Sequence, residues 1–584
     1  MGSSDAVSRR SVLGGVSAAA TIPIAGCFGE VRTIAGREST EQLELRVATL
    51  PADVDPYSAR ITTALVENLT EVGIDAQPDP LEPEELLRRV LINHDFDIYV
   101  GRYPGDGDPE TLWSLLRSSY GEESGWQNPF GFSDLALDDL LETQRRSDGT
   151  DRQTAVEEIQ DVVVREQPFT TVCFADRISI VRTDQFQGWD RKGLSDPLSY
   201  LTLESDSATE LRVATQDHRI TQNWNPIAAE HRNEGVVIGL LYEPLCRILD
   251  DELVPWLARE VTWDHEDGLT ATVLLRDASF HDGRPVTAED VTFSYRFLRD
   301  TSLGRMETPV PTSWRRGRVS LVEDVEAFGT SGVEFSFGTD NPSVARRAFT
   351  TPILPESEWI DRTYGADVAG IDLAGRTTEA LIQPNDDPIG SGPFRFVESE
   401  PRSHLRLERF DEHFLREDAT GIPPQYAGGP SVEAIEFLAV PSSEAVVQTI
   451  TDGEAAADGN GLHADVIQQT GGTRELDRRI GEQSVFYHLG YNCRRQPLSD
   501  ARFRRAVARL IDREHLVETA FGGYARPAER PIPEPWSENG WDGMGSLPFA
   551  GIDGDLTTER ARDLFREAGY QYDDGELVVR SESR

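Results

Sequence analysis

The sequence has almost no lysine. Lys192 is the only one, so the 57 basic residues are otherwise arginines, and they stand against 102 acidic residues for a formal net charge of −45. A phosphate backbone is bound by dense Lys and Arg, which argues against nucleic acid as a partner. The hydrophobic share of 38% lies in the globular range once glycine is added, and 584 residues suffice for two or three domains with sizeable cores.

The charge balance also indicates the solvent in which the chain folds. Like charges at this density repel one another in dilute salt, but at about 1 M salt the Debye length is roughly 3 Å and the repulsion is screened. Scarce lysine beside abundant arginine and excess acid resembles the composition of halophilic archaeal proteins, with an ordinary acidic protein as the alternative. We therefore expect the fold to loosen when salt is removed.

Cysteines and catalytic motifs are scarce too. Cys173, Cys246 and Cys493 lie far apart among apolar residues, which predicts buried free thiols in preference to a disulfide or a metal site. The sequence has no Gly-x-Ser-x-Gly, His-Glu-x-x-His or Gly-x-x-x-x-Gly-Lys motif, and its 10 histidines are dispersed. We expect neither a hydrolase nor a metal centre, and no cofactor.

The only long run of apolar and small residues is at the N-terminus. It follows Arg9 and Arg10 and ends in Ile-Ala-Gly-Cys at Cys27, and it is too short and glycine-rich for a good membrane span. The paired arginines resemble a twin-arginine export signal, and the final tetrapeptide resembles a lipobox, whose cysteine becomes the lipid-attached first residue. Residues 1–27 are therefore expected to be a signal and residues 28–42 a flexible tether on the extracellular face of the cytoplasmic membrane.

The hexapeptide ELRVAT occurs twice, at residues 44–49 and 210–215, which hints at two related lobes. After the first copy, helical and strand patterns alternate, which predicts an α/β fold with sheets covered by helices. The strand at 96–100 ends in a glycine-rich turn, where open α/β sheets place ligands. Asp108 before Pro109 is explained as a helix cap, whereas Asp106 has no such role and is a ligand candidate.

Helix caps are visible further along the chain. Thr287 and Asp290 resemble a capping box. Asp500 is expected to cap a helix with a core stripe from Phe503 to Ile511, and the interleaved arginines, Arg504 among them, are expected to form its solvated face.

From Leu211 onward the chain resembles family 5 of the solute-binding proteins, the dipeptide, oligopeptide and nickel receptors of ABC importers. The matching segments occur in family order with roughly family spacing. They are GLLYEPL at 239–245, FHDGRPVTAEDVTFSY at 280–295, GSGPFRF at 390–396, GYN at 490–492, LSDARFRRAVARLID at 498–512 and ARDLFREAGY at 561–570.

The front of the chain resembles what the family places after the last of these segments. Residues 43–189 hold FDIYVGRYPGDGDPETLW, NPFGFSDLALDDLL and QPFTTV. We infer a circular permutation in which the old ends are joined near 203–210, with a fusion of independent fragments or a mis-assembled gene as the alternative. Arg584 is then expected near Leu43. Lobe one is expected at 171–440, with hinge crossings near Thr171 and Val440, and lobe two at 43–170 with 441–584.

The resemblance implies a two-lobed, type II periplasmic-binding-protein fold with an extra subdomain in lobe one. It implies a monomeric receptor that captures a short peptide or similar solute in its cleft, without chemistry, and delivers it to a membrane permease. An oligosaccharide or metal complex as ligand, and a sensor that presents its ligand to a signalling receptor, remain alternatives.

Peptide receptors of the family place an aspartate four residues before the loop proline, to pair with the ligand's amino group. That position is Gly105 here, and Asp106 is one residue late. Arg102 or Arg494 is a candidate partner for a carboxylate. The ligand-binding candidates are Tyr103, Gly105, Asp106, Trp224, Asn225, Tyr242, Glu243, Tyr491 and Asn492.

Overall fold

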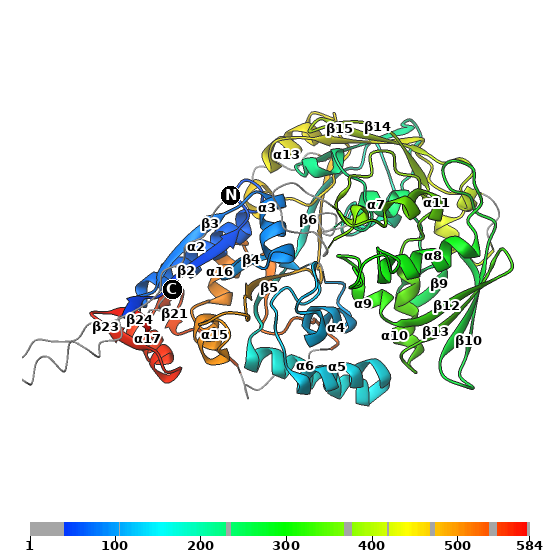
Figure 1. Ribbon diagram of the computed structural model, residues 1–584. Coiled ribbons are helices and arrows are strands. Elements are labelled where there is room, and N and C mark those ends of the chain that lie inside the picture. The colour runs from blue at the N-terminus through cyan, green and yellow to red at the C-terminus, as the bar shows by residue number, and fades with distance from the viewer. Residues whose placement is uncertain are drawn as a thin grey trace, which may run out of the picture.

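The protein folds into two lobes, each built around its own mixed sheet (Figure 1). The structure is a computed structural model, and it describes residues 40–580 except 104, 229–234, 367–376, 417–419, 468–473 and 537–545. The predicted signal with Cys27 lies outside the described residues. The last three residues of the predicted tether form strand β1 (Thr40–Gln42). Among the described residues we find no helix with the length and apolarity needed to cross a membrane.

Lobe two contains a six-stranded sheet with a hydrophobic cluster on each face. The helices that supply one cluster are α2 (Pro56–Glu71), α15 (Ala501–Ala508), α16 (Arg513–Thr519) and α17 (Thr558–Glu567). The other cluster draws on α3 (Pro83–Leu87), α4 (Glu110–Leu116), α5 (Leu135–Arg146) and α6 (Gly149–Glu166). In spatial order the strands are β20 (Ala525–Pro527), β5 (Phe169–Ala175), β19 (Phe486–Tyr491), β4 (Ile98–Tyr103), β2 (Glu44–Thr49) and β3 (Asp75–Pro80).

Lobe one contains a seven-stranded sheet and, as its subdomain, a four-stranded antiparallel sheet. The order in the larger sheet is β14 (Phe394–Glu400), β15 (His404–Arg409), β16 (Ala434–Ala439), β7 (Glu210–Thr215), β17 (Ala457–Asp458), β6 (Arg177–Arg182) and β18 (Leu476–Gly481). The order in the smaller sheet is β10 (Ala258–Asp264), β11 (Thr270–Leu275), β13 (Gly332–Phe337) and β12 (Val322–Phe328).

Most described helices of lobe one are short, and α8 is the longest of them. They are α7 (Val236–Leu241), α8 (Ala288–Arg299), α9 (Arg316–Val319), α10 (Pro342–Ala345), α11 (Glu356–Trp359), α12 (Glu379–Ile382), α13 (Ser443–Thr451) and α14 (Ala464–Ile467). Two small hairpins complete the two lobes, β8 (Cys246–Leu249) with β9 (Glu252–Pro255), and β21 (Gly551–Ile552) with β22 (Asp555–Leu556).

The repeated hexapeptide forms equivalent strands in the two lobes. The first copy is β2 and the second is β7, and each pairs in parallel with neighbours on both sides. In both copies the same three residues, Val-Ala-Thr, are buried at the carboxyl end. The local expectation of two related lobes therefore agrees with the sheet topology.

Within the described residues, the chain passes between the two large sheets twice. The first crossing is Asp176, between β5 and β6, close to the expected Thr171. The second runs from Gly481 to Phe486, and this replaces the crossing expected near Val440. Residues after Val440 remain in lobe one because β17 pairs with β7 and β18 pairs with β6.

The two ends of the described chain meet in a three-stranded sheet. Strand β1 pairs antiparallel with β24 (Glu576–Arg580), which pairs in turn with β23 (Gln571–Asp573), and Thr40 lies opposite Arg580. Arg584 itself lies outside the described residues. Gly73, at the end of α2, has a φ of +94°, and a Cβ there would lie 2.1 Å from the carbonyl oxygen of Gly575. Figure 1 shows the blue first strands beside the red last elements.

Several local predictions are confirmed and one helix is corrected. Thr287 and Asp290 form the capping box at the start of α8. The stripe from Phe503 to Ile511 is divided between α15 and the turn before α16, where Asp512 caps a second helix. Arg504 is buried and donates to three backbone carbonyls, so it is not part of a solvated face. The three described cysteines are free; Cys173 and Cys246 are buried, and Cys493 is half-buried.

Candidate functional site

A cavity of about 620 Å³ lies between the two large sheets. Lobe two contributes residues 53–57 after β2 and Gly101 and Arg102 at the end of β4. Lobe one contributes residues 216–219 after β7 and residues 460–463 after β17. These are the carboxyl ends of parallel strands, where open α/β sheets bind ligands. Both crossings also line the cavity, through Asp176 and Gln483.

The carboxylates nearest the strand ends are satisfied within their own lobes. Asp55 caps α2, accepting from the backbone N–H groups of Tyr57 and Ser58, and it also accepts from the hydroxyl of Tyr487 at 3.2 Å. Asp217 accepts from Arg219 at 2.7 Å through both oxygens. These side chains therefore fix the shape of the wall.

Asp176 differs from these carboxylates. Its Oδ1 atom is buried and has no hydrogen-bond partner among the residues that the structure describes. Burial raises the pKa of Asp176, with Glu482 adding to the rise and Arg526 opposing it. A buried oxygen without a donor costs free energy.

A second, smaller pocket of about 80 Å³ shares the Trp126 wall with the main cavity. It lies where the loop after β4 meets α9 of the lobe-one subdomain. Tyr103 and Asp106 line it from lobe two, and residues 313–318 and Arg347 line it from lobe one. The two pockets together form the cleft between the lobes.

Ion pairs join the lobes around this small pocket. Asp106 pairs with Arg318 at 3.0 Å and with Arg347, and Arg347 also pairs with Asp108 at 3.0 Å. Burial alone would raise the pKa of Asp106, but Arg347 and Arg318 hold that pKa well below its ordinary value. Asp106 therefore stays negatively charged, and its carboxylate forms ion pairs with two arginines of the opposite lobe.

Further contacts extend the same interface. Arg316 pairs bidentately with Glu123 at 3.1 and 3.2 Å. The backbone N–H of Trp126 donates to the carbonyl of Ser313 at 3.1 Å, and Arg145 pairs with Glu110 and donates to the carbonyl of Gly317 at 3.1 Å. The lobes are thus in contact along one side of the cleft.

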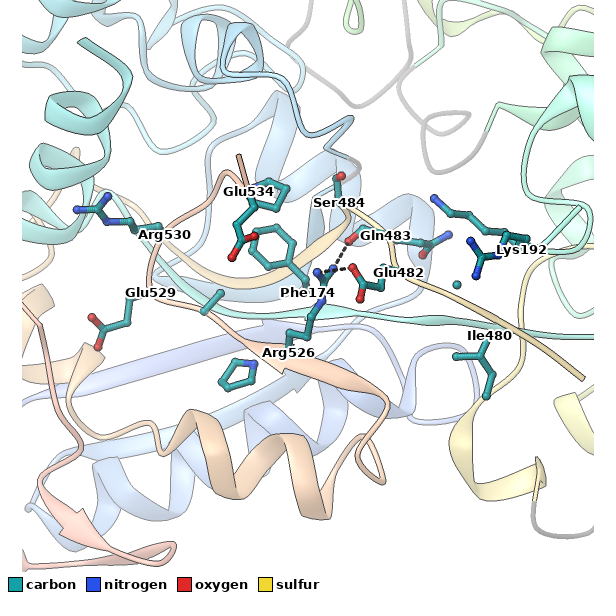
Figure 2. Close-up of a pocket in the computed structure, with 15 residues that line it drawn as sticks. Phe174, Lys192, Ile480, Glu482, Gln483, Ser484, Arg526, Glu529, Arg530 and Glu534 are labelled. Atoms are coloured by element: carbon teal, nitrogen blue, oxygen red, sulfur yellow. Dashed lines mark hydrogen bonds and ion pairs between the residues drawn. The ribbon is translucent and has the colours of Figure 1, made fainter. Parts of the chain in front are cut away.

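A third hollow, of about 1150 Å³, lies along the crossing segments (Figure 2). Its walls carry both signs of charge, with Lys192, Arg526 and Arg530 set against acidic residues. Figure 2 shows Arg526 bonded to Glu482, at 2.7 Å, and to the carbonyl of Gln483, at 3.1 Å. We assign no ligand to this hollow, because these contacts fasten β20 to the second crossing.

Three of the nine candidate residues lie at the cleft. Tyr103 and Asp106 line the small pocket. Gly105 stands beside it, and a Cβ there would lie 2.8 Å from the carbonyl oxygen of Ser484, so the second crossing requires glycine at this position. Packing against the second crossing thus explains why Gly105 stands where the peptide receptors of the family have an aspartate.

The other six candidates lie inside the lobes and line neither pocket of the cleft. Their polar groups bond within the same lobe. Trp224 donates to the carbonyl of Ile220, Asn225 to those of Ala380 and Gln383, Tyr242 bonds Asn385, Glu243 pairs with Arg247, Tyr491 bonds Thr170, and Asn492 donates to the carbonyls of His94 and Phe96. Of the two arginine candidates, Arg102 lines the main cavity, whereas Arg494 donates to backbone carbonyls.

Several residues at the cleft are not among the predicted candidates: Trp126, Asp176, His463 and the arginines of residues 315–318. Residues 216–219 could have been found, because they follow the second ELRVAT strand directly and strand ends are where clefts form. No sequence pattern indicates a role for residues 315–318. Their role depends on contact with the loop after β4, which lies about 200 positions earlier in the chain.

No group of three or more His, Cys, Asp or Glu side chains within the described ranges is placed to hold a metal ion.

Curated relatives align with only part of this chain. Oligopeptide-binding protein AppA of Bacillus subtilis is 22% identical over 325 residues, covering 54% of this chain and 51% of that protein. A putative ABC transporter peptide-binding protein of Brucella ovis is 24% identical over 374 residues, covering 61% and 60%. The chain thus spans about half to three fifths of these relatives' length.

Among solved structures, AppA of Bacillus subtilis in complex with a nonapeptide matches with a TM-score of 0.45 at 18% identity, covering 63% of this chain and 66% of that one. The sequence model described as "Bacterial extracellular solute-binding proteins, family 5 Middle" matches residues 252–583, which is more than half of the 584 residues. With its two sheets, two crossings and cleft between them, the chain belongs to family 5 of the extracellular solute-binding proteins.

Proposed function

We propose that the protein is the extracellular receptor of an ABC importer, which captures a short peptide or a similar small solute and delivers it to a membrane permease. One observation carries this proposal: the cavity of about 620 Å³ is lined from both lobes and by both crossing segments. A ligand in such a place contacts both halves at once, so its binding favours the closed form over the open one. The names of the relatives, peptide-binding proteins of ABC transporters, support the same assignment.

Closure requires motion at only two places. Asp176 joins β5 to β6 directly, and residues 482–485 join β18 to β19. Rotation about these two segments changes the distance between the walls while both sheets stay intact. A permease that distinguishes closed from open receptors then senses whether ligand is present, and the protein performs no chemistry on its cargo.

The setting of this receptor is part of the proposal. The Arg9–Arg10 pair and Cys27 favour export by the twin-arginine route and a lipid anchor, with the receptor held as a monomer at the extracellular face of the membrane. The net charge of −45 with a single lysine favours a halophilic source. An oligosaccharide or metal complex as cargo, or a sensor role, are the competing assignments.

A thermal-shift screen in molar KCl tests the cargo. Di- to pentapeptides, linear oligosaccharides and nickel complexes are added separately, and we expect peptides to raise the melting temperature through binding to the native state. Arg102→Gln, in the cavity wall, is expected to reduce that rise, whereas Arg495→Gln, on the outer surface, is not. Stabilisation by oligosaccharides alone would replace the peptide assignment, and no response to any class would contradict solute capture.

We further propose that the chain is a circular permutation of the family's order. The support is twofold: Thr40 pairs with Arg580 in one sheet, and β6 and β7 lie in one sheet with only β17 between them. Thr40 and Arg580 mark the two ends that a cut in the family's usual chain order would create. The end of β6 and the start of β7 mark the original ends of that order, which the segment 183–209 now joins. Permutation is tolerated where old and new ends lie close together at the surface.

Rejoining the chain tests this idea. A variant in which a short glycine-serine linker connects residue 580 to residue 40, with new ends opened between residues 204 and 209, is expected to fold and bind as the original does. The control opens the same linked chain between residues 437 and 438, inside β16, and is expected not to fold. Equal failure of both variants would contradict the permutation.

A further inference from the structure

The small pocket between the loop after β4 and α9 has more positive than negative charge. Four arginines line it, Arg315, Arg316, Arg318 and Arg347, against two carboxylates, Asp106 and Glu110. This excess is unexpected by chance in a chain whose net charge is −45. It therefore needs a local explanation.

Each carboxylate around the pocket already has a cation. Asp106 has Arg318 and Arg347, Glu110 has Arg145, and Glu123, just outside, has Arg316. Asp106 also accepts from the N–H of Asp108 at 3.2 Å and from the hydroxyl of Thr111 at 2.9 Å. No acidic oxygen is left over for a further cation.

Arg315 is the exception among the four arginines. Within the described residues it has no carboxylate at ion-pair distance, and its one hydrogen bond runs from Nη1 to the carbonyl of Thr350 at 3.1 Å. Its Nε is buried without a partner. Burial lowers the pKa of Arg315 to about 9; the neighbouring charge of Arg318 adds to the fall, and that of Asp106 opposes it.

The backbone holds Arg315 in this position. It precedes α9 with φ 67° and ψ 12°, the left-handed region that costs a non-glycine residue free energy. A guanidinium that is partly desolvated, has no carboxylate at ion-pair distance among the described residues and is held by a strained backbone is suited to bidentate pairing with a carboxylate.

We propose that this pocket receives a carboxylate group of the ligand, held by Arg315, and that Asp106 joins the lobes instead of receiving an amino group. The inference rests on the proposed capture of a solute in the cleft, and it names the chemistry of one end of that solute. A volume of about 80 Å³ admits a small group, so the rest of the ligand extends past Trp126 into the main cavity.

Four forms of tetraalanine test the proposal: the amino end free or acetylated, and the carboxyl end free or amidated. Titration calorimetry is run in molar KCl on the whole protein. We expect both free-carboxylate forms to bind about ten-fold or more tightly than their amides, the range of a hydrogen bond to a charged group. Acetylation is expected to change the affinity little. Equal binding of acid and amide, or loss of binding on acetylation, would overturn the proposal.

Three variants separate Arg315 from a general effect of charge. Arg315→Gln is expected to abolish the preference for the carboxylate, and Arg315→Lys to keep only part of it, since an ammonium cannot pair bidentately. Arg259→Gln, an exposed arginine on β10, is the matched control and is expected to keep the full preference. An unchanged preference in Arg315→Gln would assign the carboxylate to another residue.

The outcome remains decisive if no form of tetraalanine binds. That result contradicts the peptide part of the proposed function, and the pocket is then probed with acetate alone, replacing chloride at constant ionic strength. A rise in melting temperature in the original protein that Arg315→Gln lacks supports the carboxylate site. An equal rise in both, or none in either, refutes it.

Discussion

Below the cleft, a single histidine is enclosed by aromatic rings. The ring of His488 lies 5.1 Å from that of Tyr99, 5.8 Å from that of Phe169 and 5.5 Å from that of Phe486, and its Nε2 bonds the hydroxyl of Tyr99 at 2.8 Å. Burial lowers the pKa of His488 to about 3. Since Tyr99 and Tyr103 are themselves cleft residues, His488 supports the wall from behind.

This histidine predicts a pH dependence of stability. The unfolded chain protonates it near pH 6.5 and the native state only near pH 3, so the unfolded state binds more protons between these values. The free energy of unfolding is therefore expected to fall as the pH drops through this window, by up to about 1.4 kcal/mol per pH unit for this one group. Denaturation measured from pH 4 to 7 in molar salt checks the slope.

A pair of variants isolates the contribution of His488. His488→Phe is expected to flatten the slope by about one proton even if it lowers overall stability. His265→Gln, on an exposed turn, is expected to leave the slope as it is. Identical slopes for the original and His488→Phe would show that other groups govern this window.

At the scale of single residues, the features that can be predicted from the sequence are those that depend on neighbours along the chain. The capping box at Thr287 and the helix cap at Asp500 follow from spacing alone and are confirmed. Asp106 was singled out because its loop follows a strand, but its two arginines come from positions that share no local pattern with it. Trp224 and Tyr242 were plausible cleft aromatics, and only the packed lobe shows them satisfied in the core.

Among the elements, three contacting segments decide how the lobes meet. The turn before α4 brings Asp106 and Asp108. On the other lobe, α9 brings Arg318 and η6 (Arg346–Thr350) brings Arg347. The partners of each pair belong to different lobes, so these ion pairs exist only when the lobes are together. Arg347 has 11% of its side chain exposed and Asp106 36%, so the pairs are partly shielded from salt.

We expect Asp106→Asn to open the ligand-free protein. The substitution removes the carboxylate from two arginines, at a cost to the closed form of about 1–2 kcal/mol once the exposed third of Asp106 is allowed for. Small-angle scattering should show a larger radius of gyration, while the circular dichroism spectrum stays the same. Asp206→Asn, exposed in the segment before β7, is the matched control; an unchanged radius in Asp106→Asn would mean that other contacts hold the lobes.

The order of elements was easier to predict than their ends. Alternating helix and strand patterns gave the α/β class, and the repeated hexapeptide gave two lobes. The prediction places the second crossing about forty residues too early in the chain. The reason is that β17 and β18 carry little sequence pattern of their own and are defined by their pairing with β6 and β7. Strand pairing between distant segments cannot be predicted from the local patterns of a single sequence.

For the whole molecule, the large negative net charge leads us to expect that the fold depends on salt. Arginines take part in ion pairs over both lobes, yet acidic residues outnumber basic ones by 102 to 57. The excess cannot be neutralised by internal pairing, so it must be screened by solvent ions.

Dialysis from about 2 M to 0.1 M KCl is expected to destabilise the protein, because the Debye length grows to roughly 10 Å and the acidic residues repel over that distance. Melting followed by circular dichroism should move to lower temperature, and returning the salt should restore it. An uncharged osmolyte at equal osmolality is the control and is expected to restore less. A melting temperature independent of KCl would rule out this explanation of the composition.

The position of β19 has a consequence for how the chain is made. This strand lies between β4 and β5, but it is synthesised after Gly481, when the whole of lobe one has already emerged. Until then β4 has one unpaired edge, and β5 has two because its other neighbour, β20, is synthesised later still; other chains can join such edges. We therefore expect lobe one to fold first and lobe two to complete late, with a ribosome-bound intermediate whose open sheet depends on chaperones for protection.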